Sequence, residues 1–218
     1  MAWLALVRAD LLALSRSWVV RGWVLVLALW DFVTLVPKAG QPAPPAASEL
    51  LSMHLGSYLF VWSTVIILLS AGSFSHEADI VADGILSRAC TRTQYIAAKL
   101  AARVLVIVGI YALFSGIAGT CAWRYAAGDM SALSAATGIA VVGLALLLLI
   151  TLGVTLSVVL NNTLFAAIGL LMLWYVAAPV FSFLGAEYLS PASLVRNLPR
   201  MLKDSKAPEV VLCTATTT

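Results

Sequence analysis

Five apolar stretches, each close to the length needed to cross a bilayer, dominate this chain and restrict what it can fold into. A helix that crosses the hydrocarbon core needs about 20 mainly apolar residues. The stretches are residues 22–36 with their flanks, 56–74, 100–123, 137–160 and 164–184. Charged residues make up only 11% of the 218 positions, whereas a soluble domain carries about 25%. The sequence therefore predicts an all-α, polytopic transmembrane helical bundle with five evident spans, in a single domain over residues 1–218.

The remaining polar residues do not indicate an enzyme or a nucleic-acid binder. The formal net charge is only +3, and no basic run is interleaved with aromatic residues, so we expect no nucleic-acid partner. Cys90, Cys121 and Cys213 lie far apart without CxxC spacing, which indicates neither a metal site nor a disulfide framework. The sequence GxxxxGK[ST] does not occur, so the chain by itself is not expected to hydrolyse ATP. We expect no catalytic, cofactor-binding or metal-binding residue.

The distribution of Lys and Arg predicts the orientation of the chain, because these residues concentrate in cytoplasmic loops. Seven lie in the N-terminal segment and between the second and third apolar stretches: Arg8, Arg16, Arg21, Arg88, Arg92, Lys99 and Arg103. Only Lys38 and Arg124 lie on the opposite side. We therefore expect a multi-pass protein of the cell (plasma or inner) membrane, with a cytoplasmic N-terminus and an external Pro-rich loop at residues 37–45.

The segments that flank the spans are expected to lie along the membrane surface. Residues 1–18 combine apolar residues at helical spacing with tryptophan and arginine, which favours an interfacial helix over a simple extension of the first span. Five spans from a cytoplasmic start place residues 186–206 outside, as a helix begun by Ser190 with Pro191 at its first position. The apolar residues expected at the interface are Leu194, Val195 and Leu198.

A sixth span is expected after residue 206 if that segment is external, yet the chain ends where it would begin. The basic residues of the tail also conflict with an external position. We therefore expect that the C-terminus is truncated or unusually short. The alternative is that one of the five stretches is not a full crossing.

The segment between the second and third stretches, residues 75–103, is the most polar internal part of the chain. A helix can begin near Ser75, with Glu77 and Asp79 in its first turn, where carboxylates suit the positive end of the helix dipole. Asp83-Gly84 permits a bend, and Thr93 can cap a second helix that continues into the third span. The pattern predicts an amphipathic element along the cytoplasmic surface rather than an ordinary polar connection.

The order of residues through this segment is itself a pattern. After an acidic residue come Asp83-Gly84-Ile85-Leu86-Ser87-Arg88, Thr91-Arg92, Tyr95-Ile96, Lys99 and Arg103. This order resembles permease subunits of ABC transporters, in the type-2 exporter class. The N-terminal helix, the external loop, the turn at Leu160-Asn161-Asn162 and Leu189-Ser190-Pro191 extend the resemblance over about residues 1–200. The chain departs from the family in having Cys90-Thr91 where a proline is often found, and in lacking the sixth span.

The resemblance implies a membrane-spanning permease subunit that moves an unidentified substrate outward. In that family the segment at residues 75–99 holds the coupling helix, which docks on a separate ABC ATP-binding subunit where ATP and Mg are bound. The docking residues it implies are Glu77, Asp79, Ile80, Asp83, Gly84, Ile85, Leu86, Arg88 and Arg92. The resemblance also implies a homo- or heterodimer of permeases. The alternative is a non-transporting membrane anchor or assembly subunit that tethers a soluble partner.

Small residues follow one stripe of the third span. They are Gly109, Ala112, Ser115, Gly116 and Gly119. Such a stripe allows close approach of helices, either between two copies of the chain or, more commonly, within one copy.

Asp31 is the one acidic residue inside an apolar stretch. A carboxylate near the centre of a span costs about 2.5–3.5 kcal/mol, and the many surrounding Leu, Val and Phe residues, at about 0.3–0.6 kcal/mol each, outweigh it. Intramembrane ionisable residues are candidates for proton or cation sites. No basic partner is evident within a span, and Trp30 and Phe32 suit an external interface instead. His54 and His76 are expected at span ends on opposite faces, so they do not indicate haem.

Overall fold

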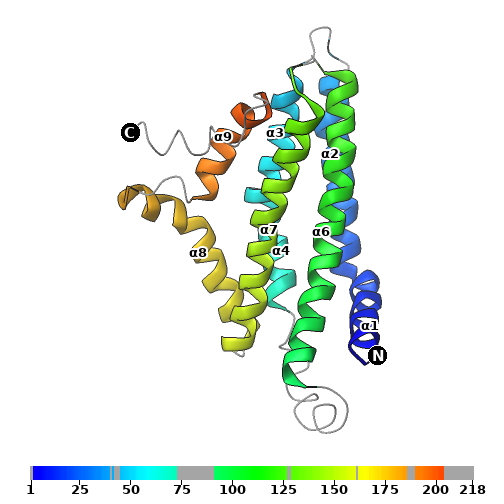
Figure 1. Ribbon diagram of the computed structural model, residues 1–218, viewed down its shortest axis with the longest axis vertical. Helices are drawn as coiled ribbons and strands as arrows, with labels where there is room; N and C mark the ends of the chain where they lie inside the picture. The colour runs from blue at the N-terminus through cyan, green and yellow to red at the C-terminus, as the bar shows by residue number, and fades with distance from the viewer. Residues whose placement is uncertain are drawn as a thin grey trace. The chain divides into compact units, whose positions relative to one another are not determined.

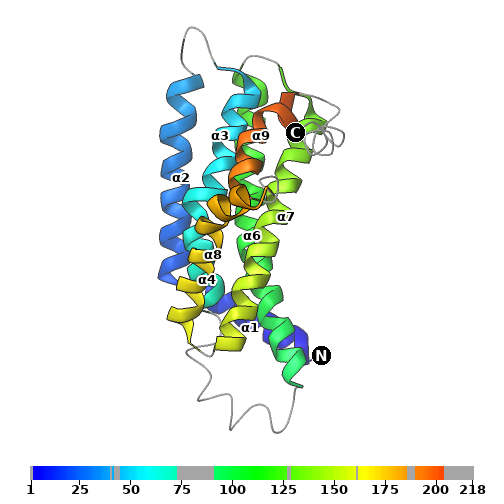
Figure 2. The ribbon, with the colours of Figure 1, turned by 90° about the vertical axis from the view of Figure 1, so that its left-hand side faces the viewer.

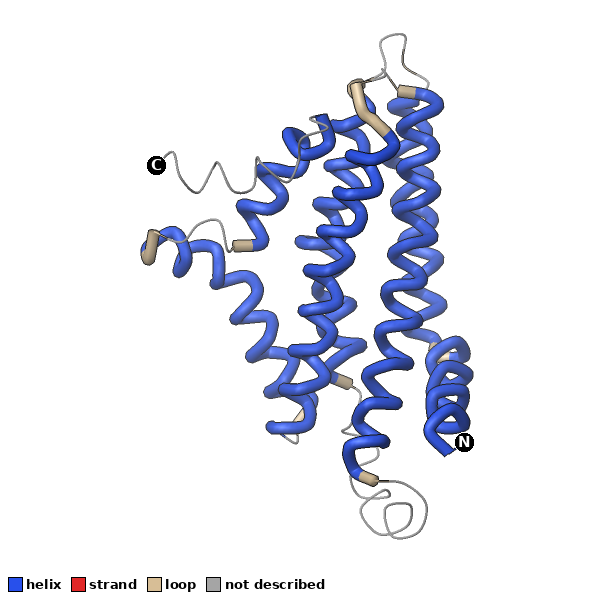
Figure 3. Tube along the Cα trace, viewed as in Figure 1, coloured by secondary structure: helices blue, strands red, loops and turns tan. Residues whose placement is uncertain are grey.

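The computed structural model describes residues 2–39, 41, 45–72, 91–126, 129–160, 162–185 and 190–203. Within these ranges the chain is helical and contains no strand (Figure 3). The helices, in chain order (Figure 1), are α1 (Ala2–Arg16), α2 (Trp18–Ala39), α3 (Ala47–Ser57), the π-helical turn η1 (Tyr58–Trp62), α4 (Ser63–Ala71), α6 (Arg92–Tyr125), α7 (Ala132–Leu160), α8 (Thr163–Phe183) and α9 (Pro191–Lys203). The predicted all-α class is confirmed for this part of the chain.

Four helices are long and apolar enough to cross a membrane, by length and composition. They are Trp18–Lys38, Ala47–Ala71, Thr93–Tyr125 and Ala132–Leu160, with mean hydropathies of 1.9, 1.6, 2.1 and 2.8. This architecture is compatible with a multi-pass membrane protein. The fifth predicted span falls on α8, whose described apolar stretch, Thr163–Val176, is shorter. A fifth crossing therefore stays a prediction.

Helix ends follow local capping chemistry. Thr91 Oγ1 accepts a hydrogen bond from Gln94 N at 3.3 Å, and Gln94 Oε1 accepts one from Thr91 N at 3.2 Å. This reciprocal pair is a capping box, so α6 is capped by Thr91, and the predicted cap at Thr93 is wrong by two residues. Asn162 Oδ1 caps α8 by accepting from Leu164 N and Phe165 N, at 2.9 and 3.3 Å.

The second span begins earlier than predicted, at Ala47 rather than residue 56. Its first turns contain polar residues that lowered the apolar signal, and the structure buries them: Ser48, Ser52 and His54. Glu49 lies in the first turn and is exposed, where a carboxylate suits the positive end of the helix dipole. Burial of these polar residues explains why hydropathy alone placed the boundary too late.

The chain forms two compact units. Unit 1 comprises Met1–Leu25, Ser63–Ile110 and Ala145–Leu173, and unit 2 comprises Val26–Trp62, Tyr111–Leu144 and Trp174–Thr218. In unit 1, α1 is a separate helix, because Ser17 interrupts the helical backbone after Arg16. Leu14 of α1 packs with Val20 and Ala102 in a buried apolar cluster. The predicted interfacial position of α1 remains a prediction.

Helices α4 and α7 approach closely within unit 1. A Cβ added at Gly153 would lie 2.1 Å from Ser70 Oγ and 2.7 Å from Ser70 Cβ. Beside this contact, Ser157 Oγ donates a hydrogen bond to Ala71 O at 2.6 Å. The close approach therefore depends on the missing side chain at position 153.

In unit 2, α9 lies side by side with α3 (Figure 2). The helix starts as predicted, with Pro191 first and Ser190 Oγ accepting from Ser193 N at 3.1 Å. Its predicted interfacial face is wrong for Leu198, which is fully buried. A Cβ added at Gly56 of α3 would lie 3.2 Å from Val195 Cγ1, so the glycine lets α9 pack inward.

The π-helical turn η1 is held by α8 within unit 2. Trp174 Nε1 donates to Leu59 O at 2.9 Å, and the Tyr175 hydroxyl donates to Phe60 O. A π-helical turn departs from the α-helical hydrogen-bond pattern, and such turns are frequent at functional sites. The turn directly follows α3, the helix that contains His54, and it begins with Tyr58, which is fully buried.

Candidate functional site

Most of the predicted docking residues lie outside the part of the chain that the structure describes. These are Glu77, Asp79, Ile80, Asp83, Gly84, Ile85, Leu86 and Arg88. Arg92 opens α6, with only its backbone described. The coupling helix and its docking surface therefore stay predictions, and the described candidate site is built around Asp31.

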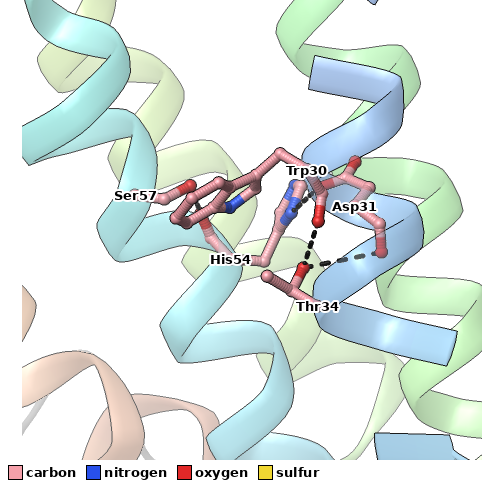
Figure 4. Close-up of polar contacts among 5 residues, drawn as sticks. All are labelled: Trp30, Asp31, Thr34, His54 and Ser57. Carbon is pink, nitrogen blue, oxygen red and sulfur yellow. Dashed lines mark hydrogen bonds and ion pairs between the residues drawn. The ribbon is translucent and has the colours of Figure 1, made fainter. Parts of the chain in front are cut away.

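Asp31 of α2 pairs with His54 of α3 inside unit 2 (Figure 4). Asp31 Oδ1 lies 2.9 Å from His54 Nδ1, and the residues are only 7% and 3% exposed. Asp31 precedes Lys38 by seven residues and His54 follows Ala47 by seven, which corresponds to about 10 Å of helix in each case. The two side chains therefore lie at matching depths in the α2–α3 hairpin.

This contact corrects two predictions. Asp31 has a basic partner in the next helix, and His54 lies inside α3 rather than at a span end. The signal was present in the sequence, since the two residues stand at similar distances from the loop that joins the helices. It was hidden because the second span was predicted to begin at residue 56, after His54.

Aromatic rings continue from the pair toward α6 and α7 within unit 2. The His54 ring meets Tyr58 edge-on at 5.3 Å between centroids, and Tyr58 meets Tyr111 at 4.9 Å and 84°. The Tyr111 hydroxyl donates to Ile139 O at 2.7 Å. Sequence analysis did not identify either tyrosine, because aromatic residues in apolar stretches are common and carry no spacing signal. Edge-to-face aromatic contacts of this kind stabilise by about 0.5–1.5 kcal/mol beyond burial.

The polar atoms of the pair are cut off from other partners. Both Asp31 carboxylate oxygens, both His54 ring nitrogens and the Tyr58 hydroxyl are buried without a hydrogen bond to any described residue. The contact between Asp31 and His54 is therefore a close approach of a carboxyl group and an imidazole without an aligned N–H donor. A charge buried alone in apolar surroundings is costly, so a charge on either group would depend on the other for compensation.

The hydroxyls nearest the pair are directed at their own helices (Figure 4). Thr34 Oγ1 donates to Trp30 O at 2.7 Å, and Ser57 Oγ donates to His54 O at 2.6 Å. Each hydroxyl proton is thus used on a backbone carbonyl. Neither hydroxyl donates to the Asp31 carboxylate or to the His54 ring; where they contact these two residues, they donate to the backbone carbonyls.

A second ion pair joins α1 to α6 in unit 1. Lys99 Nζ lies 3.2 Å from Asp10 Oδ1, and Lys99 is only 4% exposed. The same ammonium lies 5.5 Å from the centre of the Tyr95 ring, within cation–π range. Lys99 and Tyr95 both belong to the residue order that carries the family resemblance. The pair fixes α1 against the first turns of α6.

Asp129, in the connection between α6 and α7, ties that connection to the start of α3 in unit 2. Ser48 donates to its carboxylate twice, from N at 3.1 Å and from Oγ at 2.5 Å. Partial burial raises the pKa of Asp129, but the hydrogen bonds from Ser48 and the charge of Lys203 outweigh it, so the pKa lies below its ordinary value. The carboxylate therefore stays ionised at neutral pH.

Some residues in the small-residue stripe of α6 are packed against other helices, and others have open space beside them. Ser115 is fully buried in unit 2, whereas a Cβ added at Gly109, in unit 1, or at Gly116, in unit 2, would have nothing within 4 Å. In unit 2, Gly116 and Gly119 line a groove of about 290 Å³ together with Met130 and Ile139. A role in pairing two copies stays a prediction.

No group of three or more His, Cys, Asp or Glu residues suited to a metal ion occurs among the residues that the structure describes. Comparison of the chain with protein-family models, with curated proteins and with solved structures finds no match.

Proposed function

We propose that this chain is the membrane-spanning permease subunit of an ABC exporter, driven by a separate ATP-binding subunit. The observation that carries the proposal is the position of the charged segment. Residues 73–90 connect two helices of membrane-crossing length, and they hold four charged residues in a chain that is 62% hydrophobic. A polar segment so placed is available to a soluble partner.

The ion pair between Asp10 and Lys99 supports a mechanical role for this region. Helix α6 starts directly after the charged segment, and Lys99 lies two turns into it. Because Lys99 holds Asp10 of α1, a displacement of the first turns of α6 also moves α1. Force applied at the docking segment thus reaches two helices of unit 1.

In the proposed mechanism, ATP binding and hydrolysis in the partner move the surface on which residues 80–88 dock. The apolar side chains of Ile80, Ile85 and Leu86 make the apolar contacts with the partner. The mixed charges of Asp83 and Arg88 set the register of docking and its specificity more than its affinity. The motion passes to the second and third spans and opens a path between two permease copies.

The test is a charge reversal within the docking segment. Asp83→Arg combined with Arg88→Asp keeps the net charge and reverses the pattern. The ATPase for the test is sought as an adjacent reading frame that carries the phosphate-binding loop, and it is co-expressed with the chain. We expect the double variant to insert into the membrane at the wild-type level and to lose co-purification with that ATPase.

The matched control reverses one acidic and one basic exposed residue elsewhere, Glu49→Arg with Arg124→Glu. The control is expected to retain the ATPase. Equal recovery of the ATPase by both double variants would rule out the docking assignment. If the wild-type complex binds the ATPase but shows no ATP-dependent transport in any vesicle assay, the membrane-anchor alternative is favoured.

A further inference from the structure

The Asp31–His54 pair has no role in the docking mechanism, yet it is the most deeply buried ion pair among the described residues. Its side chains are 9% and 2% exposed, and they join α2 to α3 within unit 2. A polar pair of this kind costs free energy in an apolar bundle unless its charges balance. Whether the charges of the two side chains cancel depends on the number of protons bound to them.

Few other titratable groups face the pair. From η1 the Tyr58 ring lies against His54, and from α6 Tyr111 lies against Tyr58. Helix α7 contains no titratable side chain between Ala132 and Leu160. The other charged residues of unit 2 near these helices are directed elsewhere. Lys38 contacts Met53 Sδ, and Asp129 accepts hydrogen bonds from Ser48 N and Oγ. The remaining five are exposed: Glu49, Arg124, Arg196, Arg200 and Lys203. No further charge of the described residues is therefore placed to compensate the pair.

The charge of the pair follows from its proton count. With one proton the pair is neutral, because a carboxylate faces an imidazolium or a carboxylic acid faces an imidazole. With no proton a single carboxylate remains buried, and with two protons a single imidazolium remains. Both of these states place an uncompensated charge among apolar side chains, which is strongly unfavourable. The neutral state with one proton is favoured.

We propose that Asp31 and His54 form a proton-binding site within the apolar helices. A hydronium ion of the solvent transfers a proton to a ring-nitrogen lone pair of His54: one O–H bond breaks and leaves water, one N–H bond forms, and the Asp31 carboxylate, 2.9 Å from Nδ1, balances the new charge. Since both side chains are buried, release of this proton requires α2 and α3 to separate. Occupancy of the site is thereby tied to the packing of these two helices.

The test uses the fact that the chain has two histidines. In a His76→Gln chain, reconstituted in lipid nanodiscs without any ATPase, His54 is the one remaining histidine. Ring-¹⁵N NMR reports the protonation of His54, and infrared spectroscopy of the carboxyl band reports that of Asp31. At pH 7.5, where a free histidine is mostly neutral, we expect one proton on the pair, and we expect Asp31→Asn to leave His54 neutral.

The matched control is Asp10→Asn, which removes the carboxylate of the other ion pair and is expected to leave the His54 signal unchanged. A neutral imidazole together with an ionised Asp31 in the His76→Gln chain at pH 7.5 would overturn the proposal. That result needs no Asp31 variant, so it decides the question even if Asp31→Asn does not fold. Because no partner is present, the outcome is also independent of the proposed export function.

Discussion

The effect of the buried Asp31–His54 pair on the stability of the α2–α3 hairpin depends on whether both side chains are present. In the proposed state with one proton, Asp31 and His54 compensate each other's charge, and no other described charge lies against them. Removal of one member of a buried pair costs about 3–5 kcal/mol, because the other is left alone, whereas replacement of both by apolar residues is often neutral. We therefore expect the pair to contribute more to the specificity of this packing than to its stability.

We therefore predict strong coupling in a double-mutant cycle. Asp31→Leu and His54→Leu should each lower the free energy of unfolding by about 3–5 kcal/mol at neutral pH. The double variant should lose far less than the sum, as measured by SDS-induced unfolding in mixed micelles. Additive losses would show that the two residues act independently.

The contact between Ser48 and Asp129 gives a pH-dependent prediction. The pKa of Asp129 is lowered in the folded chain, so its contribution to stability is present above the ordinary value of 3.8 and is lost as the pH falls below it. Ser48→Ala should cost about 1 kcal/mol at pH 7 and less at pH 3. A cost that is the same at both pH values would contradict the assignment.

At the scale of helices, glycine sets how closely α4 and α7 pack in unit 1. Gly153→Ala would place a Cβ 2.7 Å from Ser70 Cβ, an atom that no rotation of the Ser70 side chain can move. We predict a loss of about 1–3 kcal/mol in unfolding free energy. Gly169→Ala in α8 is the control, since nothing lies within 4 Å of its Cβ position, and it should be neutral or stabilising. Equal stabilities of the two variants would mean that the α4–α7 contact tolerates a side chain.

The helices themselves were predictable because hydropathy is a local property of the sequence. The positions of α2, α6 and α7 follow from their apolar content, and the start of α9 follows from Ser190-Pro191. The early start of α3 was missed, since buried serines and a histidine depress hydropathy. The burial of Leu198 was missed because it depends on neighbouring helices that sequence spacing does not reveal.

Sequence spacing does not reveal contacts between helices, and this also explains why only part of the candidate site was predicted. Asp31 could be identified from the sequence because a carboxylate within an apolar stretch is recognisable without knowledge of the fold. Its partner His54 and the rings of Tyr58 and Tyr111 lie on other helices, so only tertiary structure brings them together. Sequence analysis therefore identified one member of a cluster of four.

For the protein as a whole, the proposed function requires that the charged segment lies on the cytoplasmic side of the membrane. Four helices of membrane-crossing length are described, and the excess of Lys and Arg in the N-terminal and 75–103 segments predicts that both face the cytoplasm. Docking of a nucleotide-hydrolysing partner is possible only on that side. The proposed coupling helix, the proposed partner and the proposed direction of transport therefore all depend on the predicted membrane orientation.

The most direct test is labelling of Arg88→Cys, in a chain whose own cysteines are replaced, by a membrane-impermeant maleimide added to intact cells. We expect no labelling until the cells are permeabilised, and reduced labelling when the ATPase is bound. Gln41→Cys, in the loop predicted to be external, should react in intact cells. Labelling of Arg88→Cys from outside intact cells would contradict the account.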